Sequence, residues 1–179
     1  ESMLELRAAA ALSLSPERRA LYLRHALDEQ RHATAFARHA QEICLALDVP
    51  GFGHPRTGTE SLFERLGETR FLAFVHLGER RGRSQFEAYQ AFFAARGDDK
   101  LRALFAALIG DEREHERYTR ALLGEQAGED EARRALRRVA AWEGLRRFHR
   151  AGRSLTTSLY RLAMTLLYMT LWPFALVVR

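Results

Sequence analysis

Two short stretches of this 179-residue chain have the same pattern, Asp28-Glu29-Gln30-Arg31-His32 and Asp111-Glu112-Arg113-Glu114-His115. In an α-helix, residues three positions apart lie on the same face. The glutamate and the histidine of each stretch can therefore point at one ion. A carboxylate together with an imidazole suits iron, manganese or zinc. Each stretch is a candidate half of a metal site.

The two stretches are expected at matching depths in their helices. Ser15-Pro16 is a strong helix start, because serine is a good N-cap and proline suits the first helical position. Asp98 is the cap candidate of the later helix. Glu29 and Glu112 each follow their cap by 14 residues, which places both about 21 Å into a helix. Both also fall on apolar stripes, where an ionisable group is costly unless it is paired or bound to metal.

A third glutamate, Glu79, is the central polar member of another apolar stripe. It precedes the turn at Arg96-Gly97 by 17 residues, so an antiparallel neighbour would bring it close to the level of Glu112. A di-iron site in a four-helix bundle takes one glutamate from each of two helices and Glu-x-x-His from each of the other two. For the remaining helix the best candidate is Glu1, and Glu5, one turn nearer the loop, is the alternative.

The sequence as a whole predicts an all-α fold. No segment alternates with period two over a useful length, so no sheet is expected. The predicted helices cover residues 1–12, 16–47, 59–96 with a bend near Gly67, and 99–124. Two short turns and one long crossover, which links the second helix to the third, join them. One long connection between two antiparallel pairs is the arrangement of a ferritin-like four-helix bundle.

These residues resemble the ferritin-like di-iron carboxylate superfamily, which includes rubrerythrins, bacterioferritins and demethoxyubiquinone hydroxylases. The resemblance covers about residues 1–124, and segments 28–33 and 111–118 look most like rubrerythrin and bacterioferritin helices. It implies two iron ions, or manganese in their place. The ligand set that it implies is Glu1, Glu29, His32, Glu79, Glu112 and His115.

The resemblance also implies a role for each ligand. Glu29 and Glu112 would bridge the two ions, Glu1 and Glu79 would be terminal ligands, and one histidine would cap each ion. Rubrerythrins are expected to carry a further glutamate where this chain has Gly82. That difference places peroxidase activity of the rubrerythrin type in doubt.

Two aspartates, Asp28 and Asp111, precede their glutamates symmetrically. Outer carboxylates commonly accept the second N–H of a metal-bound histidine. We therefore expect each aspartate to orient the histidine of the opposite stretch. The alternative is that both are ordinary surface residues.

Other polar and aromatic residues lie near the two stretches. His25, His32 and His39 are spaced by seven, which is compatible with haem ligation but favours a half-buried histidine face. Tyr22 and Tyr118 could tune or reduce a metal site. Packing in the core is the better interpretation of both tyrosines.

The C-terminal third has a different composition from the bundle. After a polar connector at 124–130, residues 131–153 predict an Arg-rich amphipathic helix. Nine arginines lie between 131 and 161, and the next 17 residues, 162–178, carry no charge. Seventeen residues is the lower limit for spanning a bilayer. The predicted domains are therefore a bundle at 1–124, a basic connector helix at 125–153 and an apolar segment at 154–179.

We expect the apolar segment to attach the protein to a membrane, with its basic flank holding the bundle at the cytoplasmic face. Packing against the bundle, or against a partner in a homodimer or membrane complex, is the alternative. The net charge is +5, and Lys100 is the only lysine. Such arginine bias indicates a GC-rich bacterial genome, so nucleic-acid binding is not expected. The single Cys44 excludes an intramolecular disulfide and a multi-cysteine metal site.

The sequence thus predicts a di-iron oxidoreductase that uses O₂ or peroxide. Its substrate would be hydrophobic, such as a quinone or an acyl chain, or would be ferrous iron. Two other hypotheses compete with this one. The chain could be a metal-free helical membrane subunit or adaptor, or a tRNA-modifying hydroxylase, since such a hydroxylase shares the fold.

Overall fold

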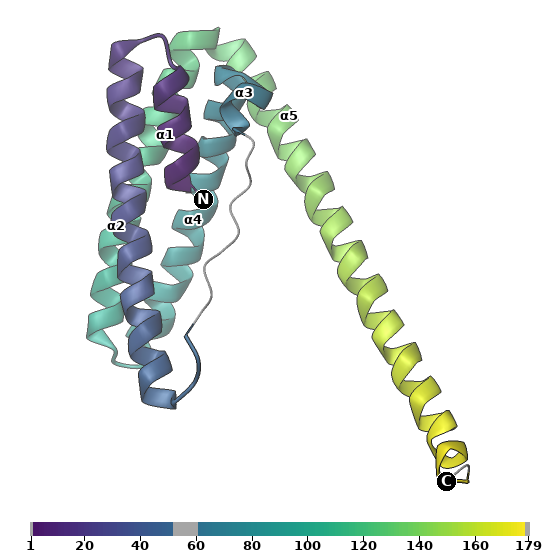
Figure 1. Cartoon of the computed structure of the whole chain (residues 1–179). Helices are drawn as coiled ribbons and strands as arrows, with labels where there is room; N and C mark the ends of the chain where they lie inside the picture. The colour runs from purple at the N-terminus through teal and green to yellow at the C-terminus, as the bar shows by residue number, and fades with distance from the viewer. Residues whose placement is uncertain (1, 52–60, 178–179) are drawn as a thin grey trace. The chain divides into compact units, whose positions relative to one another are not determined.

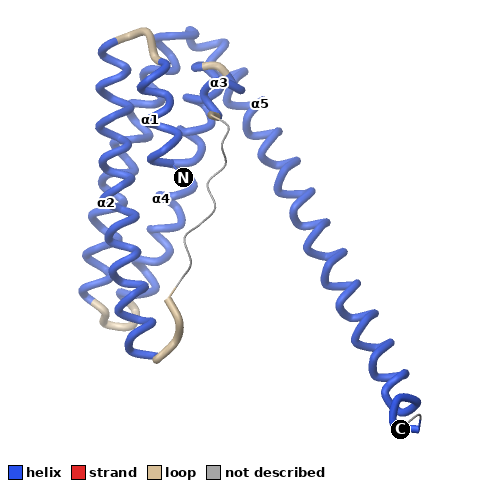
Figure 2. The backbone as a smooth tube through the Cα atoms, viewed as in Figure 1, coloured by secondary structure: helices blue, strands red, loops and turns tan. Residues whose placement is uncertain are grey.

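The computed structural model describes residues 2–51 and 61–177, and every regular element in those ranges is an α-helix. The helices are α1 (Ser2–Leu12), α2 (Pro16–Leu47), α3 (Leu62–Leu66), α4 (Glu68–Ala94) and α5 (Asp99–Val177). The bundle consists of α1, α2, α4 and the first part of α5 (Figures 1 and 2). The predicted all-α, ferritin-like fold class is confirmed.

The helices of the bundle form two antiparallel pairs. A short turn joins α1 to α2 at residues 13–15, and a second one joins α4 to α5 at residues 95–98. In Figure 1, α2 and α4 run in the same direction, since α4 begins at the end of the bundle opposite to the one at which α2 ends. The connection between them is the predicted long crossover, and its residues 52–60 lie outside the described part of the chain.

Local capping sets the starts of the two long helices. The Ser15 hydroxyl accepts a hydrogen bond from the Arg18 backbone N–H at 3.2 Å, and Pro16 is the first residue of α2. The Asp98 carboxylate accepts from the Leu101 backbone N–H at 3.0 Å in the same way. Each cap satisfies a backbone donor that the first turn of a helix leaves unpaired. α2 and α5 therefore start where the sequence predicts, so Glu29 and Glu112 lie at the expected depth in their helices.

The predicted third helix is divided in two. Gly67 has a φ of 70° and separates α3 from α4. Glycine adopts this left-handed region without the steric cost that other residues pay. The chain therefore turns sharply at Gly67 instead of bending within one helix.

The predicted polar connector at 124–130 contains a break between two helical stretches. The helix continues through this region and is interrupted only at Gly128, whose φ of 73° and ψ of 158° are not helical. Arg120 reaches across the interruption to Glu129 at 2.5 Å. Beyond it, Ala132 and Ala135 are buried. Glu129 and Asp130 pair with Arg120 and Arg133, which flank the segment on its two sides.

Two apolar layers enclose the middle of the bundle. On one side the Tyr22 ring contacts Phe71 edge-on at 6.1 Å between centroids. On the other, Phe36, Phe86 and Phe105 contact one another with centroids 5.7–6.2 Å apart. Such aromatic contacts supply much of the burial in a core of this size. The polar side chains between these layers are held at a fixed level of the bundle.

The described chain divides into two compact units, residues 1–136 and 137–179. The second unit is helical through Val177, and the Arg146 guanidinium lies 4.6 Å from the centre of the Trp142 ring. Large apolar side chains on it are exposed, among them Leu159, Leu162 and Trp172. Within the described residues, no helix combines the length and the apolarity that crossing a bilayer requires.

Candidate metal centre

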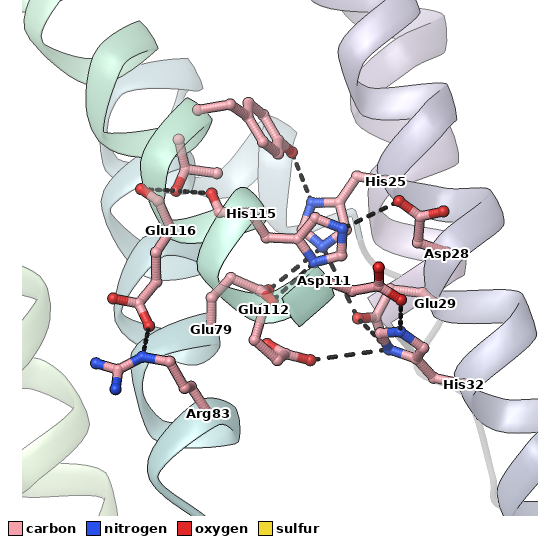
Figure 3. A network of polar contacts seen from close by, with 12 residues as sticks. His25, Asp28, Glu29, His32, Glu79, Arg83, Asp111, Glu112, His115 and Glu116 are labelled. Carbon is pink, nitrogen blue, oxygen red and sulfur yellow. Dashed lines mark hydrogen bonds and ion pairs between the residues drawn. The ribbon is translucent and has the colours of Figure 1, made fainter. Parts of the chain in front are cut away.

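One face of α2 contributes three side chains to the polar layer, His25, Glu29 and His32 (Figure 3). Their spacing of four and then three residues places them in one row along the helix. Both histidines are buried, and Glu29 is half-buried. The row lies between Tyr22 and Phe36 of the two aromatic layers, so the stripe that anchors α2 in the core also aims these groups inward.

The other two long helices of the bundle face this row. α4 contributes Glu79, and α5 contributes Glu112 and His115. All three are at least 92% buried, with exposed fractions of 8%, 4% and 2%. Burying ionisable groups to this degree is costly unless each has a partner. Every partner in this layer must therefore come from the layer itself or from a bound ion.

The side chains fall into two groups whose ligand atoms lie within 4.8 Å of one another. The first consists of His25, Glu29, Glu79 and His115, and the second of Glu29, His32 and Glu112. Glu29 belongs to both groups. Two neighbouring ions could therefore share one carboxylate, which is the arrangement of a dinuclear centre.

The separations between these groups leave room for an ion between them. The His115 Nδ1 lies 3.3 Å from Glu79, and the His32 Nδ1 lies 3.7 Å from Glu29 and 3.8 Å from Glu112. Two ligands about 2.1 Å from one ion are about 3.0 Å apart at a right angle and about 4.2 Å apart when they are opposite, so all three separations can be spanned by an ion. The donor set therefore fits transition-metal ions.

Two aspartates hold the outer sides of the histidine rings. The His32 Nε2 donates to Asp111 at 3.0 Å, and the His115 Nε2 donates to Asp28 at 3.2 Å. Each aspartate thus contacts the histidine of the opposite helix. These bonds leave the Nδ1 of both rings facing the carboxylates (Figure 3). An outer acceptor of this kind fixes the tautomer and orientation of a metal-binding histidine.

Part of the charge in the layer is also compensated without a metal. Burial lowers the pKa of His25, but its contacts with Glu29 and Glu79 outweigh this and raise the pKa to about 9. Burial raises the pKa of Glu29, yet His25 and His32 lower it to about 2. Burial, followed by the neighbouring Glu79, raises the pKa of Glu112. Protons on His25 and Glu112 therefore compensate the carboxylate charge, and metal binding would displace them.

The structure does not bring every candidate residue to the centre. Glu1 lies outside the described residues. Glu5, the alternative, accepts a hydrogen bond from the Leu62 backbone N–H at 2.8 Å and so caps α3. His39 pairs with Glu42 at 3.4 Å instead of joining the layer. The first-helix ligand is thus not identified among the described residues.

His25 belongs to the cluster but is absent from the predicted ligand set. The available signal was its spacing, since it lies one helical turn before Glu29 and seven residues before His32. That spacing places all three on one face. His25, His32 and His39 are spaced by seven residues, but His39 lies at the surface. The regular spacing therefore gave no sign that His25 belongs to the cluster and His39 does not.

The absence of a side chain at Gly82 leaves room for the carboxylate of Glu112. A Cβ atom at this position would lie 3.1 Å from the Glu112 Oε2. Rubrerythrins are expected to carry a further glutamate at this position. In this chain the Glu112 carboxylate lies beside that space. A larger residue at position 82 would force Glu112 to move.

Comparison with known proteins identifies the family. The rubrerythrin family model matches residues 4–123, which include most of α1, all of α2 and α4, the first part of α5 and every residue of the two candidate groups. Comparisons with curated proteins and with solved structures give no match. The matched residues make up most of the bundle, and the resemblance seen in the sequence is confirmed. This chain belongs to the rubrerythrin family, within the ferritin-like di-iron carboxylate superfamily.

Proposed function

We propose that this chain binds two iron ions in the polar layer and uses them to reduce O₂ or peroxide while a second substrate is oxidised. The observation that carries the proposal is the pair of His/Glu groups that share Glu29. Iron is preferred to manganese because three imidazoles contribute to the cluster, and nitrogen ligands suit iron better. When bound, two ferrous ions supply the two electrons that, with two protons, convert O₂ to hydrogen peroxide or hydrogen peroxide to two waters.

The protein residues have separable tasks in this reaction. Glu29, Glu79 and Glu112 hold the ions and balance their charge. Asp28 and Asp111 fix the histidine rings from outside. The aromatic layers limit access of water, which keeps the electrostatic interactions strong.

The second substrate is ferrous iron or a hydrophobic molecule. Asp28 and Asp111 lie where the layer meets solvent, with side chains 17% and 39% exposed. Carboxylates at that edge support ferrous iron as the substrate, and Arg31, 2.5 Å from Asp28 and 3.8 Å from Asp111, offsets part of their charge. The exposed apolar side chains of the second unit, such as Leu159 and Leu162, support a lipid-soluble substrate such as a quinone or an acyl chain.

Membrane attachment is part of this proposal. Apolar side chains exposed beside a basic segment are typical of surfaces that lie on anionic membranes. We expect the second unit to bind the membrane from the cytoplasmic side and the bundle to remain in water. A quinone or acyl substrate would then be within reach.

The test is metal content combined with oxidation kinetics. Purified protein loaded anaerobically with ferrous iron should bind two ions per chain and consume O₂ or peroxide on exposure. Glu112→Ala and His115→Ala should lose iron. Glu114→Ala is the matched control, because Glu114 lies on the same helix and pairs with Arg117 at the surface.

Two outcomes would contradict the proposal. A folded wild type that binds no iron would exclude a di-iron function and favour a metal-free subunit or adaptor. Equal iron content in all three variants would mean that the cluster is not the binding site. Oxidation of excess ferrous iron, compared with oxidation of a short-chain quinol, then distinguishes the two substrates.

A further inference from the structure

We propose that His25 is an additional metal ligand and that Tyr118 is its positioning residue, so that the ion beside Glu79 and His115 has two imidazoles and the ion beside His32 has one. The inference rests on the proposed di-iron function, which it deepens. It concerns a residue outside the two Glu-x-x-His stretches. Its basis is the geometry on either side of the His25 ring.

The first observation is an orphaned nitrogen. The His25 side chain is fully buried, and its Nε2 makes no hydrogen bond. This atom lies 3.5 Å from Glu79 and 3.8 Å from Glu29. These contacts are within ion-pair range, but a buried ring nitrogen that makes no hydrogen bond is costly. An ion bound by these carboxylates would provide the missing partner, because the separations match those between ligands of one ion.

The second observation is the outer contact of the same ring. The His25 Nδ1 lies 2.6 Å from the Tyr118 hydroxyl. A metal-bound histidine usually donates a hydrogen bond from its other ring nitrogen to an acceptor. His32 does so with Asp111 and His115 with Asp28. With Nδ1–H donated to the tyrosine oxygen, the lone pair of Nε2 would point into the layer.

Packing supports the same assignment. The His25 and His115 rings are stacked, with centroids 3.6 Å apart and planes 29° apart. Tyr118 lies on α5 one turn after His115 and meets the His25 ring edge-on. The ring is thus confined from two sides and cannot turn its nitrogen away from the carboxylates.

A different buried histidine provides the control. His76 on α4 is 8% exposed, similar to His32 at 6%. Its Nδ1 lies near the Glu116 carbonyl and the Thr119 hydroxyl, and it is absent from both candidate groups. Replacing His76 therefore tests the effect of losing a buried imidazole that is not a ligand.

The experiment measures cobalt(II) binding to wild type, His25→Gln, Tyr118→Phe and His76→Gln, with the bound imidazoles counted by X-ray absorption. We expect His25→Gln to weaken binding of one of the two ions by at least about 10-fold, the lower bound for losing even an outer partner. Its imidazole count should fall from three to two for each pair of ions. Tyr118→Phe should weaken the same ion while the count stays at three, and His76→Gln should match wild type.

Whether His25→Gln weakens or strengthens metal binding shows whether His25 is a ligand or only a positive charge between two carboxylates. If His25 served only as a cation between two carboxylates, its removal would leave metal binding unchanged or make it tighter, and the proposal would be overturned. Unchanged binding in Tyr118→Phe would overturn the positioning role of the tyrosine. The wild-type imidazole count decides the matter even if His25→Gln does not fold, since a count of two excludes His25.

These outcomes are distinguishable from failure of the proposed function. If the wild type binds neither iron nor cobalt, the proposed di-iron function itself is wrong. Two bound ions with two imidazoles would retain that function and reject only the assignment of His25.

Discussion

Glu79 shows how a buried carboxylate can be stable before any metal binds. In sequence it is the lone polar member of an apolar stripe, which suggests an unpaired charge that only a metal relieves. In the structure it lies 3.3 Å from the His115 Nδ1 and 3.5 Å from the His25 Nε2. Burial raises the pKa of Glu79, but His115 and His25 outweigh it and lower the pKa well below the usual range. The folded protein therefore favours the charged form.

This pairing predicts the effect of Glu79→Gln. The variant should lose metal affinity, because a neutral amide is a poorer ligand than a carboxylate. It should also destabilise the metal-free protein at pH 7, since a lowered pKa contributes stability above pH 4.5 that a glutamine cannot provide. Thermal melts with and without iron measure both effects. A metal-free variant that melts above wild type would show that the charge of Glu79 is unpaired after all.

The histidines predict a pH dependence of the metal-free protein. The pKa of His25 is raised to about 9 from 6.5, so its contribution to stability is complete below pH 6.5 and is lost as the pH rises to 9. The slope for one proton is at most about 1.4 kcal/mol per pH unit. The raised pKa of Glu112 also lowers the stability of the folded protein as the pH rises. Urea unfolding should give a falling stability from pH 6.5 to 9.

His25→Gln is the informative variant for this slope. It should make the decline shallower without abolishing it, because Glu112 still holds its proton in the folded state. A decline as steep as that of wild type would mean that His25 is not charged in the metal-free layer. His39→Gln is the control, since His39 lies at the surface of the same helix.

Residue identity and spacing predicted much of the cluster but not all of it. Glu29, His32, Glu112 and His115 follow from two local patterns, because i and i+3 residues share a face wherever a helix forms. The place of His25 depends on Tyr118, which is 93 positions away in sequence. No local pattern contains that contact. A residue whose role is set by a distant partner is therefore the kind that sequence alone leaves ambiguous.

At the scale of elements, single glycines decide where helices stop. The predicted starts at Ser15 and Asp98 are confirmed, because capping is a local interaction. The polar composition of 124–130 predicted a connector but not the residue at which the helix breaks. What interrupts the helix is the backbone of Gly128, with a φ of 73°. Composition cannot reveal which of several glycines adopts that conformation.

Two glycines of α5 test this account. Gly128→Ala should destabilise the protein by about 1–3 kcal/mol, because its φ and ψ lie in a region that is essentially restricted to glycine. Gly110→Ala should stabilise it by up to about 1 kcal/mol, since Gly110 is helical and a Cβ there meets no atom within 4 Å. Chemical denaturation of both variants measures the difference. Stabilisation by both substitutions would mean that α5 is continuous through Gly128 in solution.

At the scale of the whole molecule, the chain carries two units of different character. The first unit contains the cluster, its aromatic layers and the family match at residues 4–123. The second unit contains the basic and apolar helix. All described cluster residues lie between positions 25 and 115. Metal binding should thus depend on the first unit, and membrane attachment on the second.

Truncation at two points separates these properties. A chain ending at Leu136 keeps Ala132 and Ala135, which are buried, and should fold and bind iron as the full chain does. A chain ending at Gly128 loses both alanines and should melt at a lower temperature. Flotation with anionic vesicles should recover the full chain and leave both truncated chains in solution. If the chain ending at Leu136 unfolds or loses iron, the apolar helix is a structural part of the bundle, and if it still floats, the bundle itself binds the membrane.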